Sequence, residues 1–401
     1  MLENKLIKKY AEILVLGIIS VFMGVIVGII DTIFGKVLIA ITSFRELHAL
    51  FLIPFLPVAG AVIIFLYDRF NIESMRGMSL VFEAGNNQRD NIPVVLIPLV
   101  TVSTWLTHLF GGSAGREGVA VQIGASVGNF LGRRITIENS SKILLVAGMA
   151  AGFGGLFQTP AAAVFFSLEV LSTGLLEHRA LLPALTASYT ACYTSRFLGL
   201  EKFFVDINTD LTFNGYILIK LLIIGIIFGV AGGSFAYFLN KTKKCFAEYF
   251  VSPVKKIIFI GIVISLFSLL FHAGRYSGLG TNLISESFGG GKIYWYDFLM
   301  KFVFTIVTLA AGFQGGEVTP LFSMGASLGI VLSSFAGLPS VFTAALGYAC
   351  MFGSATNTLI APMFIGAEVF GYDYMPYFIL VCSISYIFNG DKSIYSLQRK
   401  N

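Results

Sequence analysis

Gly124-Ala125-Ser126-Val127-Gly128 recurs 201 residues later as Gly325-Ala326-Ser327-Leu328-Gly329 in this chain of 401 residues. Two further pairs repeat at an offset of 199, namely Phe153-Gly154 with Phe352-Gly353 and, more loosely, Leu168-Glu169-Val170 with Ala367-Glu368-Val369. Matches at an offset of half the chain length predict that the two halves are copies of one fold. We therefore expect a first repeat over residues 1–200 and a second over 201–401.

The composition indicates that both repeats lie in a membrane. Hydrophobic residues make up 56% of the chain and charged residues 12%, with a mean hydropathy of +0.82. A soluble domain carries about 25% charged residues, so this chain lacks the polar surface that a water-soluble protein of its size needs. A membrane β-barrel is excluded as well, because its strands alternate polar and apolar residues. The sequence predicts an all-α polytopic membrane protein.

Apolar segments of two kinds follow one another along the chain. Five are close to the length of about 20 residues that spans a bilayer: 13–30, 51–67, 214–239, 257–273 and 297–313. Seven are short or interrupted by Gly or Pro: 92–110, 119–131, 143–157, 161–176, 321–337, 341–353 and 357–370. Short helices at membrane depth are tolerated where they line a wet cavity, which favours a transporter or channel of roughly a dozen to eighteen helical pieces.

The polar segments predict how the chain is oriented. Lys5, Lys8 and Lys9 precede the first apolar run, so we expect the N-terminus in the cytoplasm of a multi-pass protein of the cell membrane. The lysine-rich stretch 241–256 is expected to be a polar cytoplasmic link between two long helices. The polar end 389–401 is short, so no soluble regulatory domain is expected.

The side chains that usually bind metals or cofactors are scattered. The four cysteines and four histidines show no metal-ligand spacing, so we expect no metal and no cofactor. The net charge of +5 comes from basic residues at the ends of apolar runs, which favours a membrane surface over nucleic acid as the partner.

The first copy of the repeat opens with Gly111-Gly112-Ser113-Ala114-Gly115-Arg116-Glu117-Gly118. Small residues before a helix allow its unpaired N–H groups to approach an anion. Glu117 is itself an anion there, and a carboxylate in a membrane segment is by default a functional hypothesis. It could occupy the anion site when charged and leave it when protonated, which would exchange an anion for a proton. The alternative is a structural ion pair between Glu117 and Arg116.

The second copy opens with Gly312-Phe313-Gln314-Gly315-Gly316-Glu317-Val318-Thr319-Pro320. Pro320 suits the first turn of a helix, so a second helix N-terminus is expected to point at the same centre. Glu317, Thr319 and the backbone N–H groups are candidate ligands for an anion or a proton. The alternative is that Glu317 only caps its helix.

Gly115-Arg116-Glu117-Gly118 resembles the signature of the CLC family of chloride channels and anion/proton antiporters, and Gly-Gly-x-x-x-Pro at 315–320 resembles its second anion-binding motif. Lys392-Ser393-Ile394-Tyr395-Ser396 is similar to the family's C-terminal segment, whose tyrosine faces the anion. The resemblance implies a CLC-type two-repeat fold and a homodimer with one pathway per subunit. It also implies an anion site formed by Met78, Gly115, Arg116, Gly118, Gly316, Val318, Thr319 and Tyr395.

Departures from the family pattern resemble its fluoride-specific clade. Met78 stands where chloride-type members have serine, Val119 replaces a proline, and Glu317-Val318 replaces an apolar pair. The resemblance implies a fluoride/proton antiporter that exports fluoride, with Glu117 as gate and proton carrier. The alternative is a chloride channel or chloride/proton exchanger of the same fold. A membrane-embedded enzyme or receptor is disfavoured, because no histidine has a plausible catalytic partner nearby in sequence.

The proton route also departs from the family. Many antiporters of the family carry an internal glutamate at the position of Val170. Its absence here leaves Glu117 as the main proton carrier, with Glu317 assisting. Glu169, at the end of a helix, is expected to be structural.

Overall fold

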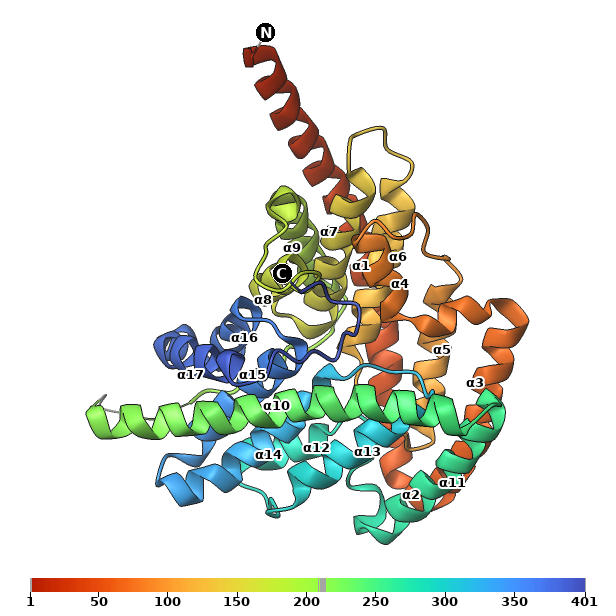
Figure 1. Cartoon of the computed structure of the whole chain (residues 1–401), viewed down its shortest axis with the longest axis vertical. Helices are drawn as coiled ribbons and strands as arrows, with labels where there is room; N and C mark the ends of the chain where they lie inside the picture. Colours follow the sequence, from red (N-terminus) through yellow and green to blue (C-terminus); the bar gives the residue numbers. More distant parts are fainter. Residues whose placement is uncertain (1, 208, 210–213, 401) are drawn as a thin grey trace.

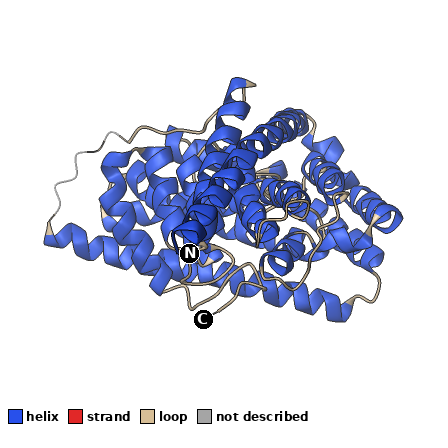
Figure 2. Cartoon of the chain, turned by 90° about the horizontal axis from the view of Figure 1, so that it is seen from above, coloured by secondary structure: helices blue, strands red, loops and turns tan. Residues whose placement is uncertain are grey.

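The computed structural model describes residues 2–207, 209 and 214–400, with side chains from residue 7 onward, so the side chain of Lys5 lies outside the described part. Within this part there are seventeen α-helices and five short 3-10 helices but no strand (Figure 2). The α-helices of the first half are α1 Leu2–Leu47, α2 Ala49–Leu52, α3 Leu56–Phe70, α4 Met78–Gly85, α5 Leu96–Leu109, α6 Glu117–Gly132, α7 Ser140–Phe157, α8 Pro160–Glu169 and α9 Leu181–Phe197. Those of the second half are α10 Gly215–Tyr249, α11 Pro253–Leu270, α12 Thr281–Gly289, α13 Asp297–Ala311, α14 Val318–Ala336, α15 Ser340–Thr356, α16 Ile360–Phe370 and α17 Met375–Ile387.

The arrangement confirms an all-α multi-pass membrane protein. Among the described residues, six helical stretches are long and apolar enough to cross a bilayer: Ile7–Leu47, Ala49–Phe70, Ser140–Phe157, Gly215–Tyr249, Pro253–Leu270 and Val318–Ala336. Two of them are much longer than a bilayer requires. Figure 1 shows α1 in red, running upward to the N-terminus, and α10 in green, crossing the lower half of the molecule.

The first helix is longer than predicted. The sequence indicated a span over 13–30, whereas α1 continues to Leu47. The short 3-10 helix Ile53–Phe55, which contains Pro54, separates α2 from α3. Proline cannot donate its backbone nitrogen to a helix, which explains why the predicted span 51–67 is divided. The last turns of α1 therefore reach the region where the two halves meet.

The sequence suggested that the glycines of the repeated pentapeptide interrupt their helices. In the structure, α6 and α14 continue through them. A Cβ atom on Gly124 or Gly128 of α6 would lie 2.0 Å from a backbone oxygen of α7. On Gly325 of α14, it would lie 2.0 Å from the Gly347 oxygen of α15. Helices in membranes associate through such small residues, because the backbones can then approach closely. The α6–α7 and α14–α15 pairs are thus packed in the same way.

The lysine-rich stretch 241–256 is not a polar link, which corrects the prediction. Helix α10 continues through Lys241, Lys243 and Lys244 to Tyr249, and only residues 250–252 connect it to α11. Lysine is a good helix former, and its long side chain can extend to water while its backbone stays in the helix. Charge alone was therefore misleading about where the helix ends.

A glutamate from each half accepts hydrogen bonds from the start of a short helix in the other half. Glu169 of α8 accepts hydrogen bonds from the N–H groups of Leu359, Ile360 and Ala361 at the start of α16, at 2.8–3.1 Å. Glu368 of α16 accepts those of Ala161 and Ala162 at the start of α8, at 3.1 and 2.9 Å. Each carboxylate therefore satisfies N–H groups that have no partner within their own helix.

We expect Gly124→Ala to destabilise the protein, because its methyl group would overlap the α7 backbone. Overpacking of this kind lowers the free energy of unfolding by about 1–3 kcal/mol. Thermal unfolding of the purified protein in detergent measures the effect. Gly215→Ala is the control, since nothing lies within 4 Å of a Cβ there. Equal melting temperatures for the two variants would contradict the packing described.

We expect Glu169→Ala to lower the free energy of unfolding by about 1–3 kcal/mol, because three N–H groups at the start of α16, one of them buried, lose their acceptor. Glu169→Gln should lose less, since it keeps one acceptor oxygen. The same thermal assay applies, with Glu138→Ala as control because Glu138 is exposed and bonds only to its neighbour Asn139. A Glu169→Ala variant as stable as Glu138→Ala would show that the cap does not stabilise the fold.

Candidate functional site

Helices α6 and α14 begin at a direct contact between the two halves. The N–H and C=O groups of Gly115 pair with those of Gly316 at 2.5 and 2.8 Å, which makes an isolated antiparallel bridge. A Cβ atom on Gly115 would lie 2.8 Å from the Cδ atom of Pro320, and one on Gly316 would lie 2.9 Å from the Gly118 nitrogen. Only glycine allows this approach, so the two helix N-termini meet as the motifs predicted.

The Glu117 carboxylate lies on the N-terminus of the opposite helix. Its Oε2 atom accepts hydrogen bonds from the backbone N–H of Thr319 at 3.2 Å and from the Thr319 hydroxyl. It also accepts one from the backbone N–H of Arg116 at 3.3 Å. The Glu117 side chain is 1% exposed. A carboxylate oxygen thus occupies a helix N-terminus, which favours negative charge.

The alternative ion pair is present as well. Arg116 Nε lies 3.6 Å from Glu117 Oε1, beyond hydrogen-bond distance. Arg116 therefore contributes positive charge beside the carboxylate, while the hydrogen bonds come from Thr319 and from backbone. The two readings of Glu117 are not exclusive.

Glu317 lies at the start of α14, and its side chain faces the start of α6. It is the residue before α14, but its side chain makes no capping hydrogen bond to that helix. Its Oε2 atom would lie 3.7 Å from a Cβ on Gly118 of α6, and its Oε1 atom lies 3.8 Å from Lys243 Nζ of α10. Glu317 therefore faces the start of α6 and a lysine, which differs from the capping alternative.

Two cavities approach this centre. The first, of about 490 Å³, is called here the Glu117 vestibule, and its walls include Glu46, Arg116, Glu117, Phe157, Thr319 and Tyr348. The second, of about 290 Å³, is called the Glu317 vestibule, and its walls include Arg76, Met78, Gln122, Lys243, Glu317 and Tyr395. None of the described residues lines both cavities, so the two glutamates open to different spaces.

The predicted site residues are divided between these spaces. Gly115, Arg116, Glu117, Gly118, Gly316, Val318 and Thr319 lie at the meeting of α6 and α14. Met78 begins α4 and Tyr395 belongs to the C-terminal segment, and both line the Glu317 vestibule. The Tyr395 ring packs on Phe82 of α4 with ring centroids 5.0 Å apart. Their roles in binding an anion remain predictions.

Two residues of the Glu317 vestibule were missed by the sequence reasoning. Gln122 lies one turn after Gly118, and its Oε1 atom is buried without a hydrogen-bond partner among the described residues. A polar residue in the apolar run of α6 was a signal that could have identified it. Lys243 gave no such signal, because the stretch 241–256 was predicted to be a polar link. Its partner Glu317 is also distant in sequence.

The loop before α6 is held by buried polar side chains. Lys301 of α13, fully buried, donates to the Ser113 hydroxyl at 2.9 Å and to the Gly278 carbonyl at 2.6 Å. The His108 ring of α5 lies 2.9 Å from the Ala114 carbonyl oxygen. These contacts fix the backbone that leads into Gly115.

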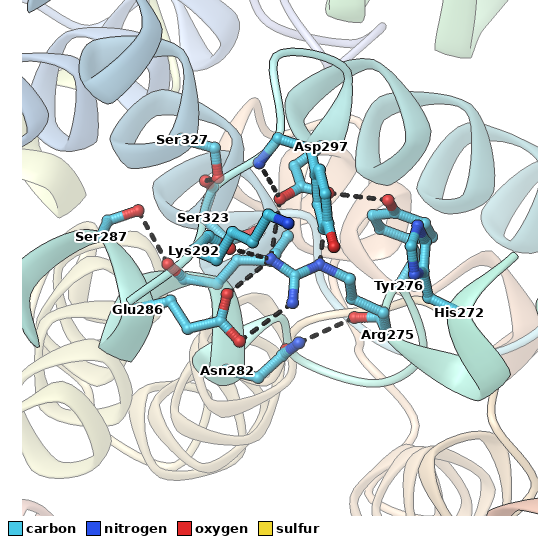
Figure 3. Close-up of polar contacts among 12 residues, drawn as sticks. His272, Arg275, Tyr276, Asn282, Glu286, Ser287, Lys292, Asp297, Ser323 and Ser327 are labelled. Atoms are coloured by element: carbon cyan, nitrogen blue, oxygen red, sulfur yellow. Dashed lines mark hydrogen bonds and ion pairs between the residues drawn. The ribbon is translucent and has the colours of Figure 1, made fainter. Parts of the chain in front are cut away.

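A charged cluster anchors the neighbouring loop (Figure 3). Arg275 lies between Glu286 of α12 and Asp297 of α13, with N–O distances of 2.9 and 2.8 Å. The Tyr276 hydroxyl donates to Asp297 at 2.7 Å. Gly278 follows, and its N–H and C=O bond to Gly112 and Ala114. The cluster thus supports the centre from the second half. Among the described residues, no three His, Cys, Asp or Glu side chains gather where they could hold a metal.

Comparison with known proteins finds relatives over most of the chain. The family model described as voltage gated chloride channel matches residues 59–390. A "Chloride/fluoride channel protein" of Pseudomonas syringae pv. tomato is 33% identical over 367 residues, which cover 89% of this chain and 80% of that protein.

Solved structures share the fold over nearly the whole chain. A crystal structure of a CLC-type fluoride/proton antiporter superposes with a TM-score of 0.96 at 51% identity, covering 98% of this chain and 99% of that one. A slow cyanobacterial Cl⁻/H⁺ antiporter superposes with a TM-score of 0.82 at 18% identity, covering 95% and 96%, and this likeness shows the fold alone.

Proposed function

The chain belongs to the voltage-gated chloride channel (CLC) family, and we propose that it is a secondary transporter that exports fluoride in exchange for protons. The observation that carries this proposal is the Glu117 carboxylate on the N-terminus of α14. The substrate follows from the likeness to the fluoride/proton antiporter, which is 51% identical. Transport, not catalysis, is the function we assign.

The donors around Glu117 suit a small anion. The charged carboxylate accepts two hydrogen bonds from Thr319, so it competes with any anion for the same donors. A proton on Glu117 removes the negative charge that this helix end favours, and the side chain can then leave. Fluoride takes its place, because a site for this strongly hydrated ion must replace its shell with several donors. The Thr319 N–H and hydroxyl supply two of them. The Tyr395 hydroxyl is proposed as a donor on the side of the Glu317 vestibule, which Tyr395 lines.

The proton is carried by Glu117, with Glu317 assisting. Val170 occupies the position of the usual internal glutamate, and it cannot bind a proton. Glu169 beside it holds three N–H groups of α16 and is engaged in that cap. Glu317 is the carboxylate nearest the start of α6 on the side of the Glu317 vestibule, so it suits proton transfer there.

Basic residues suggest the orientation in the cell membrane. Lys8 and Lys9 lie near the exposed start of α1, about 58 Å from its far end at 1.5 Å per residue, and that far end lines the Glu117 vestibule. Arg76 and Lys243 line the other cavity. Cytoplasmic loops carry an excess of Lys and Arg, so we place the N-terminus and the Glu317 vestibule in the cytoplasm.

The assembly follows from family membership. We propose a homodimer embedded in the bilayer, with one complete pathway in each subunit, since both vestibules and both glutamates belong to a single chain. We also propose that residues 1–200 and 201–401 are the two repeats. The equivalent packing of α6–α7 and α14–α15 supports this division.

We expect liposomes that contain the purified protein to release fluoride much faster than chloride. Efflux is followed with ion-selective electrodes while external pH is recorded, and fluoride release should be accompanied by proton uptake. Chloride efflux as fast as fluoride efflux would support the chloride alternative. Fluoride efflux without proton uptake would identify a channel.

We expect Glu117→Gln to abolish proton-coupled fluoride turnover, because the amide is nearly isosteric but cannot carry the proton. General acid or base groups of this kind contribute about 10²–10⁴-fold to a rate. Glu138→Gln, in an exposed loop, is the matched control and should transport as the wild type does. Coupled transport by Glu117→Gln at the wild-type rate would remove Glu117 from the mechanism.

A further inference from the structure

Lys243 connects a helix outside the centre to the Glu317 carboxylate. It lies on α10, and its Nζ atom is 3.8 Å from Glu317 Oε1 across the Glu317 vestibule. We propose that Lys243 is a positioning residue: it holds the Glu317 carboxylate toward this vestibule and offsets its charge, and so determines how readily an anion is taken up from this side. This inference rests on the proposed anion transport.

The Glu317 side chain lies between a lysine and a helix start. Oε1 lies 3.8 Å from Lys243 Nζ, and Oε2 faces the start of α6 at Gly118. Glu317 makes no capping hydrogen bond to its own helix. Since its side chain is only 12% exposed, water compensates little of its charge. Lys243 therefore acts on this carboxylate through its charge.

Contacts of α10 hold the backbone near Lys243. Asn240, one turn earlier on α10, donates to the Ser393 carbonyl at 2.8 Å, two residues before Tyr395. Gly233 lies against the backbone of Asn389, where a Cβ would be 2.0 Å from the carbonyl oxygen. Helix α10 is therefore packed on the segment that carries Tyr395. The packing of α10 on this segment thus holds the backbone near two residues of the vestibule, Lys243 and Tyr395.

The charges that line the vestibule make Lys243 different from its neighbours. Arg76 also lines the cavity, but it is engaged in a close ion pair with Glu83 of α4. Lys243 is paired with Glu317, the carboxylate that an incoming anion has to approach. Without Lys243, the negative charge of Glu317 would be less compensated and would repel that anion. Complementary charge of this kind changes association more than it changes the later steps.

The effect on transport is measurable as a change in KM. We expect Lys243→Met to raise the KM for fluoride about tenfold while kcat changes less than about twofold, as rim charges act on association. Initial rates of efflux from proteoliposomes are measured against internal fluoride concentration. Lys243→Arg should restore a KM near that of the wild type, because it keeps the charge. Lys244→Met, exposed on the same helix and outside the vestibule, is the matched control and should leave KM unchanged.

Two further measurements separate positioning from a structural role. The KM difference between wild type and Lys243→Met should shrink as salt rises, because the Debye length falls from about 30 Å at 0.01 M to about 8 Å at 0.15 M. In a Glu317→Gln background, Lys243→Met should have a much smaller effect, since the pair acts as a unit. Equal effects of Lys243→Met and Lys244→Met, or an effect independent of both salt and Glu317, would overturn the inference. Lack of fluoride transport by the wild type would instead refute the proposed function.

Discussion

Helix N-termini buried at membrane depth carry N–H groups that neither water nor their own helix can satisfy, and this constraint organises the protein. At three of these helix starts in the described part of the chain, a glutamate from the opposite half accepts hydrogen bonds from the free N–H groups. Glu169 binds the start of α16, Glu368 binds the start of α8, and Glu117 binds the start of α14. Two of these contacts hold the fold together. In the proposed function, the third involves the residue that an anion replaces, because its donors also suit fluoride.

Local chemistry made part of the structure predictable. The repeated pentapeptide and the two glycine-rich motifs indicated where α6 and α14 begin, because glycine before an apolar run and proline in a first turn are local signals. The crossing of carboxylates between halves was not predictable, since Glu117 and Thr319 are 202 residues apart. Nor was Lys243, because its pairing depends on α10 continuing past the lysines. The sequence pattern identified the helix starts but not their partners.

Glu117 and Glu317 line different cavities and differ in their surroundings. The Glu117 carboxylate is buried between two helix starts, and the Glu317 carboxylate faces a lysine in the smaller of the two cavities. The same side chain thus has two environments in one pathway. Met78, Gln122 and Tyr395 all lie on the Glu317 side.

The bridge between Gly115 and Gly316 has a mechanical consequence. Rocking one half of the chain against the other would break both of its hydrogen bonds and drive the Pro320 ring into Gly115. The bridge therefore opposes such a motion at its pivot point. Under the transport proposed here, access from the two sides would alternate through rotation of individual side chains, so the moving part would be a few torsion angles.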